Sequence, residues 1–428
     1  MIRARRFTTR AALAVLVLAL PVIVSHRLLA RSPSLPAAGA VALTELLDTT
    51  ARSGAVPAVV VLVTNADGVM FEHAAGRRDV GANAPLHEDA IFRIASMTKP
   101  MTSAAIMMLM ESGRLGLDDP AGRYVPSIDA LKVATHVNAD GSFESRPPRR
   151  AITIRDLLTH TSGIGYSFSD PILFKLQQSG KGEQDLPLLH DPGEKWTYGA
   201  STKYLGDIVE RVSGQPFDAF LRTRLLEPLE MADTSFEVAA GARSRLVTSH
   251  QRAGGTLTER PNPEVARSPV RGDGGLFSTA RDYGKFLRLF LNGGKAGSTR
   301  LLGETAIRDM TRNQIGHLVI QRQPAANSSL SQPFPLGGAS EHWGFGDTWG
   351  LGFQIAAPTT VLHRRAPGSY SWAGINNTHF WVDPRREIGV VVLMQVLPFY
   401  DPACIKLLTD VEELVNRYVG EPSRWHLG

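Results

Sequence analysis

The chain has 428 residues, of which 43% are hydrophobic and 20% are charged, a composition typical of a globular protein with a large core. The formal net charge of +5 comes partly from arginines near the N-terminus, and the rest of the chain is nearly balanced, so nucleic-acid binding is not indicated. Cys404 is the only cysteine, which excludes an intrachain disulfide. Because the sequence also lacks a cluster of zinc ligands, we expect no metal site and no other cofactor.

Residues 1–40 are expected to be an export signal or an N-terminal anchor, followed by a linker. Arginines without acidic partners precede the apolar stretch 11–24, which is short for a membrane-spanning helix and typical of a signal peptide. Residues 37–40 are a candidate cleavage site in a linker rich in Pro, Ser and Ala, and the alternative is an uncleaved anchor. In both cases we expect the body, residues 41–418, to be periplasmic or extracellular, with residues 11–24 providing membrane association if the signal stays uncleaved.

The first elements of the body are predicted to be a helix and a pair of strands. Residues 42–53 have the apolar spacing of an amphipathic helix. Two apolar stretches, 58–64 and 69–75, flank the turn sequence Asn-Ala-Asp-Gly at 65–68, which predicts a β-hairpin. The strongly apolar residues 101–110 then predict a helix that is buried nearly all round. Two strands before such a helix indicate a sheet packed against it.

Ser96 and Lys99 lie three residues apart where this buried helix begins. Residues i and i+3 share one face of a helix, so the Lys99 amine can reach the Ser96 hydroxyl. A serine hydroxyl becomes a good nucleophile when a neighbour removes its proton, and burial favours the neutral amine that can do so. Pro100 has no N–H, which keeps Ser96 at the helix start, where free backbone N–H groups can bind an oxyanion. On spacing alone, a helix cap followed by a lysine that extends to the surface is the simpler interpretation.

The middle of the chain is predicted to be mostly helical, with irregular excursions. Residues 138–150 are polar and are expected to form an exposed hairpin or excursion, and residues 164–195 are expected to form part of a lid or helical subdomain. Residues 241–271 and 317–344 are expected to be loops, and the second of these is expected to be exposed. The predicted helices, with their capping residues, are 154–158 (Thr153), 203–212 (Gly214), 217–226 and 280–291 (Ser278 or Thr279).

The C-terminal part is predicted to contain three strands and then a helix over residues 401–418. Because both ends of the chain contribute strands, we expect an α+β fold with an antiparallel sheet flanked by helices. A mostly helical subdomain, roughly residues 100–290, would be inserted between the sheet-forming ends. The active groove would lie between the sheet and this subdomain. The predicted strands are 349–356, 377–382 and 388–395.

Several separate stretches resemble the serine β-lactamase and penicillin-binding-protein superfamily, in its class C-like branch. The most specific is ITIRDLLTHTSG at 152–163, which follows the S-x-x-K pair. The resemblance implies a β-lactamase/transpeptidase-like fold in which Ser96 is the nucleophile, Lys99 is its partner base, and Tyr198 is the tyrosine of the second motif. Tyr198 would then pass the proton between the nucleophile and the leaving group. The other matching stretches are 92–99, 113–126, 192–214, 272–294 and 349–395.

Two positions depart from the β-lactamase pattern. Ala200 stands where those enzymes have the asparagine of Y-x-N, and Trp372 begins W-A-G where they have K-T-G. Tryptophan cannot pair with a substrate carboxylate as lysine does, and W-x-G at this place resembles the family VIII carboxylesterases. The resemblance also implies that Gly374 lets the strand approach the substrate. The backbone N–H groups of Ser96 and Ile375 would then form the oxyanion hole, with Trp372 beside the substrate.

Three further features have simple structural interpretations. His160, within ITIRDLLTHTSG, is expected to hold a turn behind the site. The basic cluster at 363–365 is expected to be a solvated strand end, and the alternative is that it supplies positive charge to a substrate. Cys404 lies near a helix start and is expected to be buried and inert.

The sequence therefore predicts an exported serine hydrolase that forms an acyl-enzyme on Ser96. Its partner would be a small-molecule ester or amide, with carboxylic esters favoured by the W-A-G sequence, and no nucleic acid. One alternative is action on β-lactams or D-amino-acid peptides, for example as a DD-carboxypeptidase, which export to the cell-wall compartment would favour. An alternative of another class is a non-catalytic binding protein that retains the fold.

Overall fold

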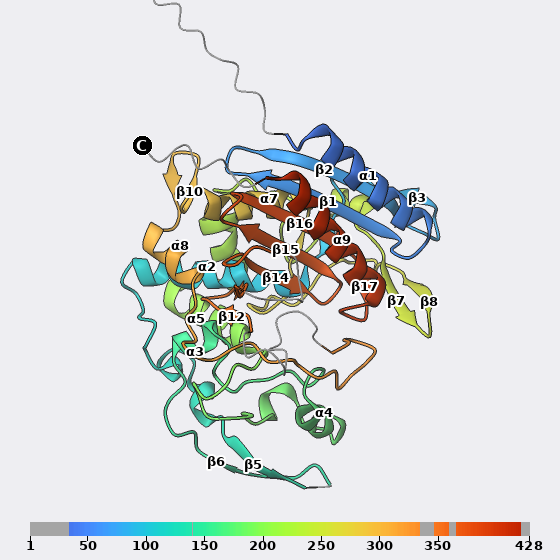
Figure 1. Ribbon diagram of the computed structural model, residues 1–428. Helices are drawn as coiled ribbons and strands as arrows, with labels where there is room; N and C mark the ends of the chain where they lie inside the picture. Colours follow the sequence, from blue (N-terminus) through green and yellow to red (C-terminus); the bar gives the residue numbers. More distant parts are fainter. Residues whose placement is uncertain (1–33, 139, 334–345, 359–364, 421–428) are drawn as a thin grey trace, which may run out of the picture. The chain divides into compact units, whose positions relative to one another are not determined.

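Both ends of the chain meet in one antiparallel sheet (Figure 1). The computed structural model describes residues 34–138, 140–333, 346–358 and 365–420. Strand β1 (Ala58–Asn65) pairs antiparallel with β16 (Ile388–Met394), with Val61 opposite Val392. The other strands of this sheet are β2 (Val69–Asp79), β3 (Ala84–Pro85), β12 (Thr348–Trp349), β13 (Gln354–Ile355), β14 (Tyr370–Gly374) and β15 (Thr378–Asp383). Within the described residues the strand order is β12-β13-β14-β15-β16-β1-β2-β3.

Helices cover both faces of this sheet. α1 (Ala37–Arg52) packs beside α9 (Pro402–Tyr418) on one face, and α7 (Ala280–Leu291) packs against β1 and β16 on the other (Figure 1). All residues of β16, and all of β1 except Asn65, are buried. Continuous apolar strands of this kind belong to sheets that are covered on both sides. The predicted α+β fold, an antiparallel sheet flanked by helices, is confirmed.

A group of helices beside the sheet contains the conspicuous sequence motifs. α2 (Thr98–Glu111) is buried from its first residue to Leu109 and packs against α5 (Ser201–Ser213), which in turn contacts α3 (Ile154–Leu158). The polar residues of these motifs lie at or near the N-terminal ends of the three helices. The remaining helices and helical turns are α4 (Pro171–Gln178), α6 (Phe217–Leu221), α8 (Glu304–Met310), η1 (Ala95–Met97), η2 (Ala121–Arg123), η3 (Pro126–Ala130), η4 (Glu183–Asp185), η5 (Arg222–Leu226) and η6 (Ala240–Arg245).

A short strand pair joins the start of the helical region to a distant loop. β4 (Phe92–Arg93) pairs antiparallel with β9 (Phe277–Ser278), so the residues just before Ser96 lie beside those that follow the Gly-Asp-Gly-Gly sequence at 272–275. The remaining strands form small ribbons: β5 (Val133–Val137) with β6 (Phe143–Arg146), β7 (Ser249–Ala253) with β8 (Thr256–Arg260) and β17 (Val396–Leu397), and β10 (Lys295–Ala296) with β11 (Thr299–Arg300).

The strand predicted over residues 349–356 is wrong. The structure has two short antiparallel strands, β12 and β13, joined by a tight turn. Gly352 adopts φ +101° in this turn, and a Cβ on Gly350 would lie 2.1 Å from the carbonyl oxygen of Met310. Both constraints depend on neighbouring backbone, which the local apolar pattern does not reveal.

Strand β14 and the hairpin of β7 and β8 are among the strands that were not predicted. Residues 370–374, which include the W-A-G sequence, form the fully buried strand β14 between β13 and β15. Residues 249–260, predicted as part of a loop, form the β7–β8 hairpin. Neither segment has the continuous β-branched run on which the other strand predictions rest, and pairing with neighbouring strands completes both of them.

The N-terminal expectations fall partly outside the described residues. The apolar stretch 11–24 lies outside them, as do residues 334–344 of the predicted loop 317–344. The candidate cleavage site 37–40 is not part of a linker, because it forms the first turn of α1, where a Cβ on Gly39 would lie 2.7 Å from the Tyr418 side chain. Among the helices of the described ranges, none combines the length and the hydropathy needed to span a membrane.

Candidate active site

Ser96 and Lys99 are hydrogen-bonded at the start of α2. Ser96 lies in η1, and Lys99 lies in the first turn of the helix that follows. The Nζ of Lys99 donates to Ser96 Oγ over 3.1 Å. Lys99 is only 1% exposed, so its amine lies inside the protein. The two residues therefore form a Ser–Lys pair with a buried lysine and a partly exposed serine, which differs from a helix cap followed by a lysine that extends to solvent.

The backbone turn that presents Ser96 is strained and is held by its neighbours. Ala95 has φ +46°, a left-handed conformation that costs an L-residue about 1–2 kcal/mol. Thr98 Oγ1 donates to the Ala95 carbonyl over 2.7 Å, and the Met97 N–H donates to the Ile94 carbonyl over 3.0 Å. These two hydrogen bonds offset the strain and fix the position of Ser96.

Lys99 has two further acceptors. Its Nζ donates to Tyr166 Oη over 3.1 Å and to the main-chain carbonyl of Asp273 over 2.6 Å. Together with Ser96 Oγ these make three acceptors, one for each N–H of an ammonium group. In the neutral amine, two N–H groups can remain on Tyr166 and Asp273 while the nitrogen lone pair faces the Ser96 hydroxyl. The geometry is therefore suited to removal of the Ser96 proton by Lys99.

A series of charged groups continues from Tyr166. Tyr166 Oη donates to Asp273 Oδ2 over 2.6 Å, and Arg271 donates to both oxygens of Asp273 over 2.8 and 2.9 Å. Arg271 also donates to both oxygens of Glu183, each over 2.9 Å. Burial would raise the pKa of the Asp273 carboxyl, but hydrogen bonds from Arg271 and the charges of Lys99 and Arg271 hold that pKa below its usual value. An ionised carboxylate, balanced by Arg271, therefore lies next to Lys99.

Tyr166 is neutral in this arrangement. Burial raises the pKa of the Tyr166 phenol well above its usual value, and the negative charge of Asp273 raises it further. Its O–H donates to Asp273 and its oxygen accepts from Lys99, so both hydrogen-bonding capacities of the hydroxyl are used.

Tyr198 lies beside the Ser–Lys pair and contacts Lys99 with its ring. The Nζ of Lys99 is 4.9 Å from the centre of that ring, and Tyr198 is 7% exposed. The ring also meets those of Tyr166 and Trp372, at centroid distances of 5.3 and 4.9 Å. Among the described residues, the tyrosine hydroxyl that accepts a hydrogen bond from Lys99 is that of Tyr166.

Strand β14 ends against the backbone that precedes Ser96. A Cβ on Gly374 would lie 2.3 Å from the Ile94 carbonyl oxygen and 2.4 Å from Thr378 Oγ1, so a glycine is required for this approach. Ile375, the next residue, is partly buried. The end of β14 is therefore held close to Ser96 by the absence of a side chain at Gly374.

Trp372 belongs to an aromatic cluster next to Tyr198. It is 3% exposed, and its ring packs edge-on against those of Tyr198 and Trp349. The site therefore has an uncharged wall at the position where the β-lactamase pattern has an amine.

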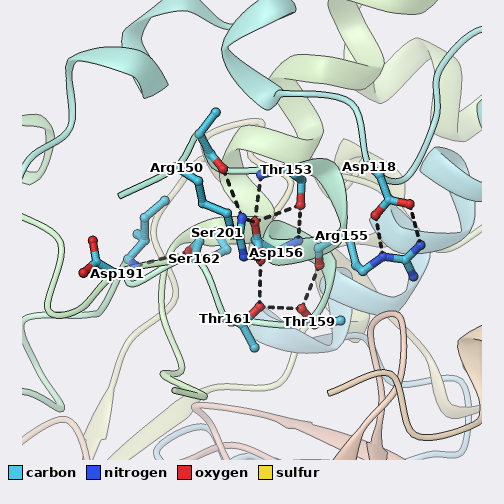
Figure 2. Close-up of polar contacts among 12 residues, drawn as sticks. Asp118, Arg150, Thr153, Arg155, Asp156, Thr159, Thr161, Ser162, Asp191 and Ser201 are labelled. Carbon is cyan, nitrogen blue, oxygen red and sulfur yellow. Dashed lines mark hydrogen bonds and ion pairs between the residues drawn. The ribbon is translucent and has the colours of Figure 1, made fainter. Parts of the chain in front are cut away.

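Asp156 organises the turn that follows α3 (Figure 2). Its carboxylate accepts from Arg150 over 2.5 and 2.9 Å, from the N–H and hydroxyl of Thr153, and from Thr161 Oγ1. The Asp156 N–H in turn donates to Thr153 Oγ1, which completes a capping box at the start of α3. These bonds fix the turn 159–163, as the figure shows.

His160 packs inside this turn. It has φ +56°, its carbonyl accepts the Thr197 N–H over 2.8 Å, and its ring centroid is 5.1 Å from that of Tyr198. Burial, with a contribution from the charge of Lys99, lowers the pKa of His160 well below its usual value, so the ring is neutral. His160 thus supports the loop that holds Tyr198, in agreement with its structural interpretation.

The last residue of the basic cluster at 363–365 is not solvated as expected. Arg365 is 7% exposed and donates to Glu412 over 2.7 Å, while residues 363 and 364 lie outside the described ranges. Cys404 is fully buried, and burial raises the pKa of its thiol well above the usual value. Across the described ranges, no group of His, Cys, Asp and Glu side chains is arranged to hold a metal ion.

Tyr166 and Asp273 are the site residues that sequence reasoning missed. They lie 67 and 174 positions from Lys99, so no spacing within a helix or strand connects them to it. Tyr166 follows ITIRDLLTHTSG closely, and Asp273 interrupts a run of glycines. These two sequence features indicate that both residues lie in unusual loops. They do not indicate that the two loops lie next to each other.

Comparison with known proteins identifies the family. The family model described as Beta-lactamase matches residues 43–412. Protein Rv1367c of Mycobacterium tuberculosis is 33% identical over 394 residues, which cover 85% of this chain and 94% of that protein. Lovastatin esterase of Penicillium rubens is 30% identical over 378 residues, covering 82% of this chain and 93% of that enzyme.

A solved structure has the same fold. The LovD6 mutant of simvastatin synthase from Aspergillus terreus superposes with a TM-score of 0.77 at 25% sequence identity, covering 90% of this chain and 96% of that one. The resemblance inferred from the sequence motifs is confirmed. Because the family match spans most of the chain and the fold agrees, this protein belongs to the beta-lactamase family.

Proposed function

We propose that this protein is an exported serine esterase that cleaves carboxylic esters through an acyl-enzyme on Ser96. The hydrogen bond between the buried Lys99 Nζ and Ser96 Oγ is the observation on which the proposal rests. The similarity to a lovastatin esterase supports an ester substrate. The apolar stretch 11–24, preceded by arginines, supports export.

Acylation begins when neutral Lys99 takes the hydroxyl proton of Ser96. Oγ attacks the ester carbonyl carbon, and the electron pair of the C=O bond moves to the oxygen. The N–H groups of Ser96 and Ile375 bind this oxyanion, and each such donor typically lowers the barrier by about 2.7–4 kcal/mol. The bond to the alkoxy oxygen then breaks, and that oxygen receives the proton from Lys99, with Tyr198 as the relay, so that the alcohol leaves.

Deacylation repeats these steps with water. Water gives a proton to the Lys99 amine as its oxygen attacks the acyl carbon of the Ser96 ester. The tetrahedral intermediate then collapses: the bond between the acyl carbon and Oγ breaks, Lys99 returns the proton to Oγ, and the carboxylic acid is released. An alcohol in place of water would complete an acyl transfer instead. The structural similarity to simvastatin synthase makes transfer to an alcohol a second candidate outcome.

The uncharged wall formed by Trp372 favours esters over the alternatives. Penicillins, cephalosporins and D-alanyl peptides carry a carboxylate, which a buried indole cannot neutralise. Ala200 provides no side-chain amide to orient an amide substrate. The hydrogen bond between Ser96 and the buried Lys99 argues against the alternative of a non-catalytic binding protein.

A substrate panel tests this proposal. Wild type, Ser96→Ala and the control Ser142→Ala, whose serine lies in the exposed β5–β6 turn, are assayed with p-nitrophenyl butyrate, nitrocefin and a D-alanyl-D-alanine peptide. We expect wild type and Ser142→Ala to hydrolyse the ester fastest, with an acyl adduct on intact mass, and Ser96→Ala to be inactive. Full ester hydrolysis by Ser96→Ala would show that the proposal is wrong.

The other outcomes identify the alternatives. Faster turnover of nitrocefin or the peptide would assign the second substrate class, and a butyryl ester formed from an added alcohol would show acyl transfer. Failure of a fluorophosphonate probe to label Ser96 would indicate a binding protein. Fractionation of cells that express the full chain, with and without residues 1–31, tests export: we expect the full chain outside the cytoplasm and the shortened one inside it.

A further inference from the structure

Asp273 contacts the amine of Lys99 directly and also reaches it through Tyr166. Its carbonyl accepts from Lys99 Nζ over 2.6 Å. Its carboxylate accepts the Tyr166 hydroxyl over 2.6 Å, and the oxygen of that hydroxyl accepts from the same amine over 3.1 Å. Besides Ser96, the Lys99 amine has two acceptors. One is the Asp273 carbonyl, and the other, the Tyr166 hydroxyl, is held in place by the Asp273 carboxylate.

The loop that contains Asp273 is fixed to two helices. Thr102 Oγ1 of α2 donates to the Gly272 carbonyl over 2.6 Å. On the other side, a Cβ on Gly272 would lie 2.3 Å from the carbonyl oxygen of Thr202 in α5, so the loop packs directly on that helix. The position of Asp273 relative to Lys99 is thus set by helix packing.

The charges around Lys99 are few. Tyr166 and His160 are neutral, because burial raises the pKa of the Tyr166 phenol and lowers the pKa of the His160 ring. Asp273 is ionised, and Arg271 neutralises it through two hydrogen bonds. The groups that face Lys99 from the elements packed around it are Ser96, His160, Tyr166, Tyr198 and Asp273.

We propose that Asp273 is a positioning residue for the reaction assigned above to Ser96 and Lys99. It holds Lys99 so that the lone pair of the neutral amine points at the Ser96 hydroxyl, and Arg271 limits how strongly its negative charge favours the ammonium form. The inference rests on the proposed function, since it requires Lys99 to act as a base.

The charge of Asp273 and the charge of Arg271 act on Lys99 in opposite directions. A carboxylate near an amine favours the ammonium form, which cannot accept a proton. Asp273→Asn keeps the main-chain carbonyl and an acceptor for Tyr166 but removes this charge, so the neutral amine is reached at lower pH. Arg271→Gln leaves Asp273 without compensation, so the neutral amine is reached only at higher pH.

The test measures two rates between pH 5 and pH 10 on the full chain: labelling of Ser96 by a fluorophosphonate, and kcat/KM for p-nitrophenyl butyrate. We expect the acidic limb of both profiles to move down by about one pH unit in Asp273→Asn and up by a similar amount in Arg271→Gln. We also expect Tyr166→Phe to lower kcat by about 10²-fold at nearly constant KM, because Lys99 loses one of its two fixed acceptors.

Asp383→Asn is the matched control. Asp383 is buried, accepts from Arg386 over 2.7 Å, and lies at the far end of β15 from Thr378, about 16 Å along an extended strand. We expect this variant to lose stability and to keep the wild-type pH profile. Circular dichroism verifies the fold of each variant, and if Asp273→Asn does not fold, the upward shift in Arg271→Gln decides the test.

The outcomes separate this inference from the proposed function. If Ser96 is labelled and esters are hydrolysed, but the two variants only slow the reaction without opposite shifts, Asp273 is merely structural and the inference is overturned. If wild type is labelled but hydrolyses no ester, the proposed function fails, while the labelling profiles still test Asp273. If wild-type Ser96 is not labelled at any pH, both are overturned.

Discussion

Lys99 donates a hydrogen bond of 2.6 Å to the main-chain carbonyl of Asp273, although the two residues are 174 positions apart in the chain. The contact joins α2 to the loop at 272–275, which itself packs on α5. The Ser–Lys pair is therefore local in sequence, but the orientation of its amine depends on tertiary contacts.

Lys99→Met should remove the base while preserving a buried side chain of similar length. We expect kcat/KM for p-nitrophenyl butyrate to fall by about 10²–10⁴-fold, the usual contribution of general base catalysis. Lys285→Met is the control, because Lys285 lies on α7 and pairs with Asp282. Near-wild-type activity in Lys99→Met would exclude Lys99 as the base.

Tyr198→Phe isolates the hydroxyl of Tyr198 from the packing of its ring. The ring contacts with Lys99 and Trp372 remain, so we expect little change in thermal stability. If the hydroxyl relays a proton, kcat should fall by about 10²-fold or more. Tyr124→Phe, which removes a hydroxyl that donates to Asp119, serves as the control and should keep full activity. An unchanged kcat in Tyr198→Phe would assign the relay elsewhere.

Gly374→Ala should displace the end of β14. The new Cβ would lie 2.3 Å from the Ile94 carbonyl oxygen, closer than real Cβ contacts allow. We expect a loss of about 1–3 kcal/mol in the free energy of unfolding and a fall of about 10²-fold in kcat, because the Ile375 N–H moves with the strand. Urea unfolding and ester kinetics measure these effects. Gly241→Ala, where nothing lies within 4 Å of the new Cβ, should change neither quantity.

His379 should make the protein less stable on the acid side. Burial, together with the charge of Arg365, lowers its pKa from 6.5 to about 3. Above pH 6.5 neither the folded nor the unfolded state binds this proton, so His379 contributes nothing to pH dependence there. Between pH 6.5 and about 3 only the unfolded state is protonated, so stability falls as pH falls, by at most about 1.4 kcal/mol per pH unit.

His379→Phe removes this effect while keeping an aromatic ring beside Phe399. Urea unfolding at pH 7, 6, 5 and 4 should show a shallower loss of stability than in wild type. The exposed residue His136, changed to Phe, provides the control and should leave the slope unchanged. An equally steep loss in His379→Phe would show that the ring is protonated in the folded state.

Cys404 should be unreactive until the protein unfolds. It is fully buried at the start of α9, and burial raises the pKa of its thiol, with the charge of Asp401 adding to the effect. At about pH 8, iodoacetamide should modify less than about one-tenth of the native protein in the time that it fully modifies the protein in about 8 M urea. Rapid native modification, detected by intact mass, would contradict the buried position.

Local patterns were sufficient for the elements that have strong signals of their own. The β1–β2 hairpin, the apolar helix α2, the capped helices α3 and α7, and α9 were all predicted from residue spacing and capping residues. Strand β14 and the turn between β12 and β13 were not, because neither has a long apolar run of its own and both depend on contacts with neighbouring backbone.

The same division applies to the site. The sequence by itself predicted the Ser96–Lys99 pair, because a separation of three residues at a helix start allows the two side chains to meet and the family motifs favour that arrangement. It also determined the family, because several motifs in a fixed order resemble it. Only the tertiary structure decided that Tyr166 and Asp273 hold the Lys99 amine. Hydrogen bonds between distant loops depend on how α2 and α5 pack, and the spacing of residues along the chain does not predict that packing.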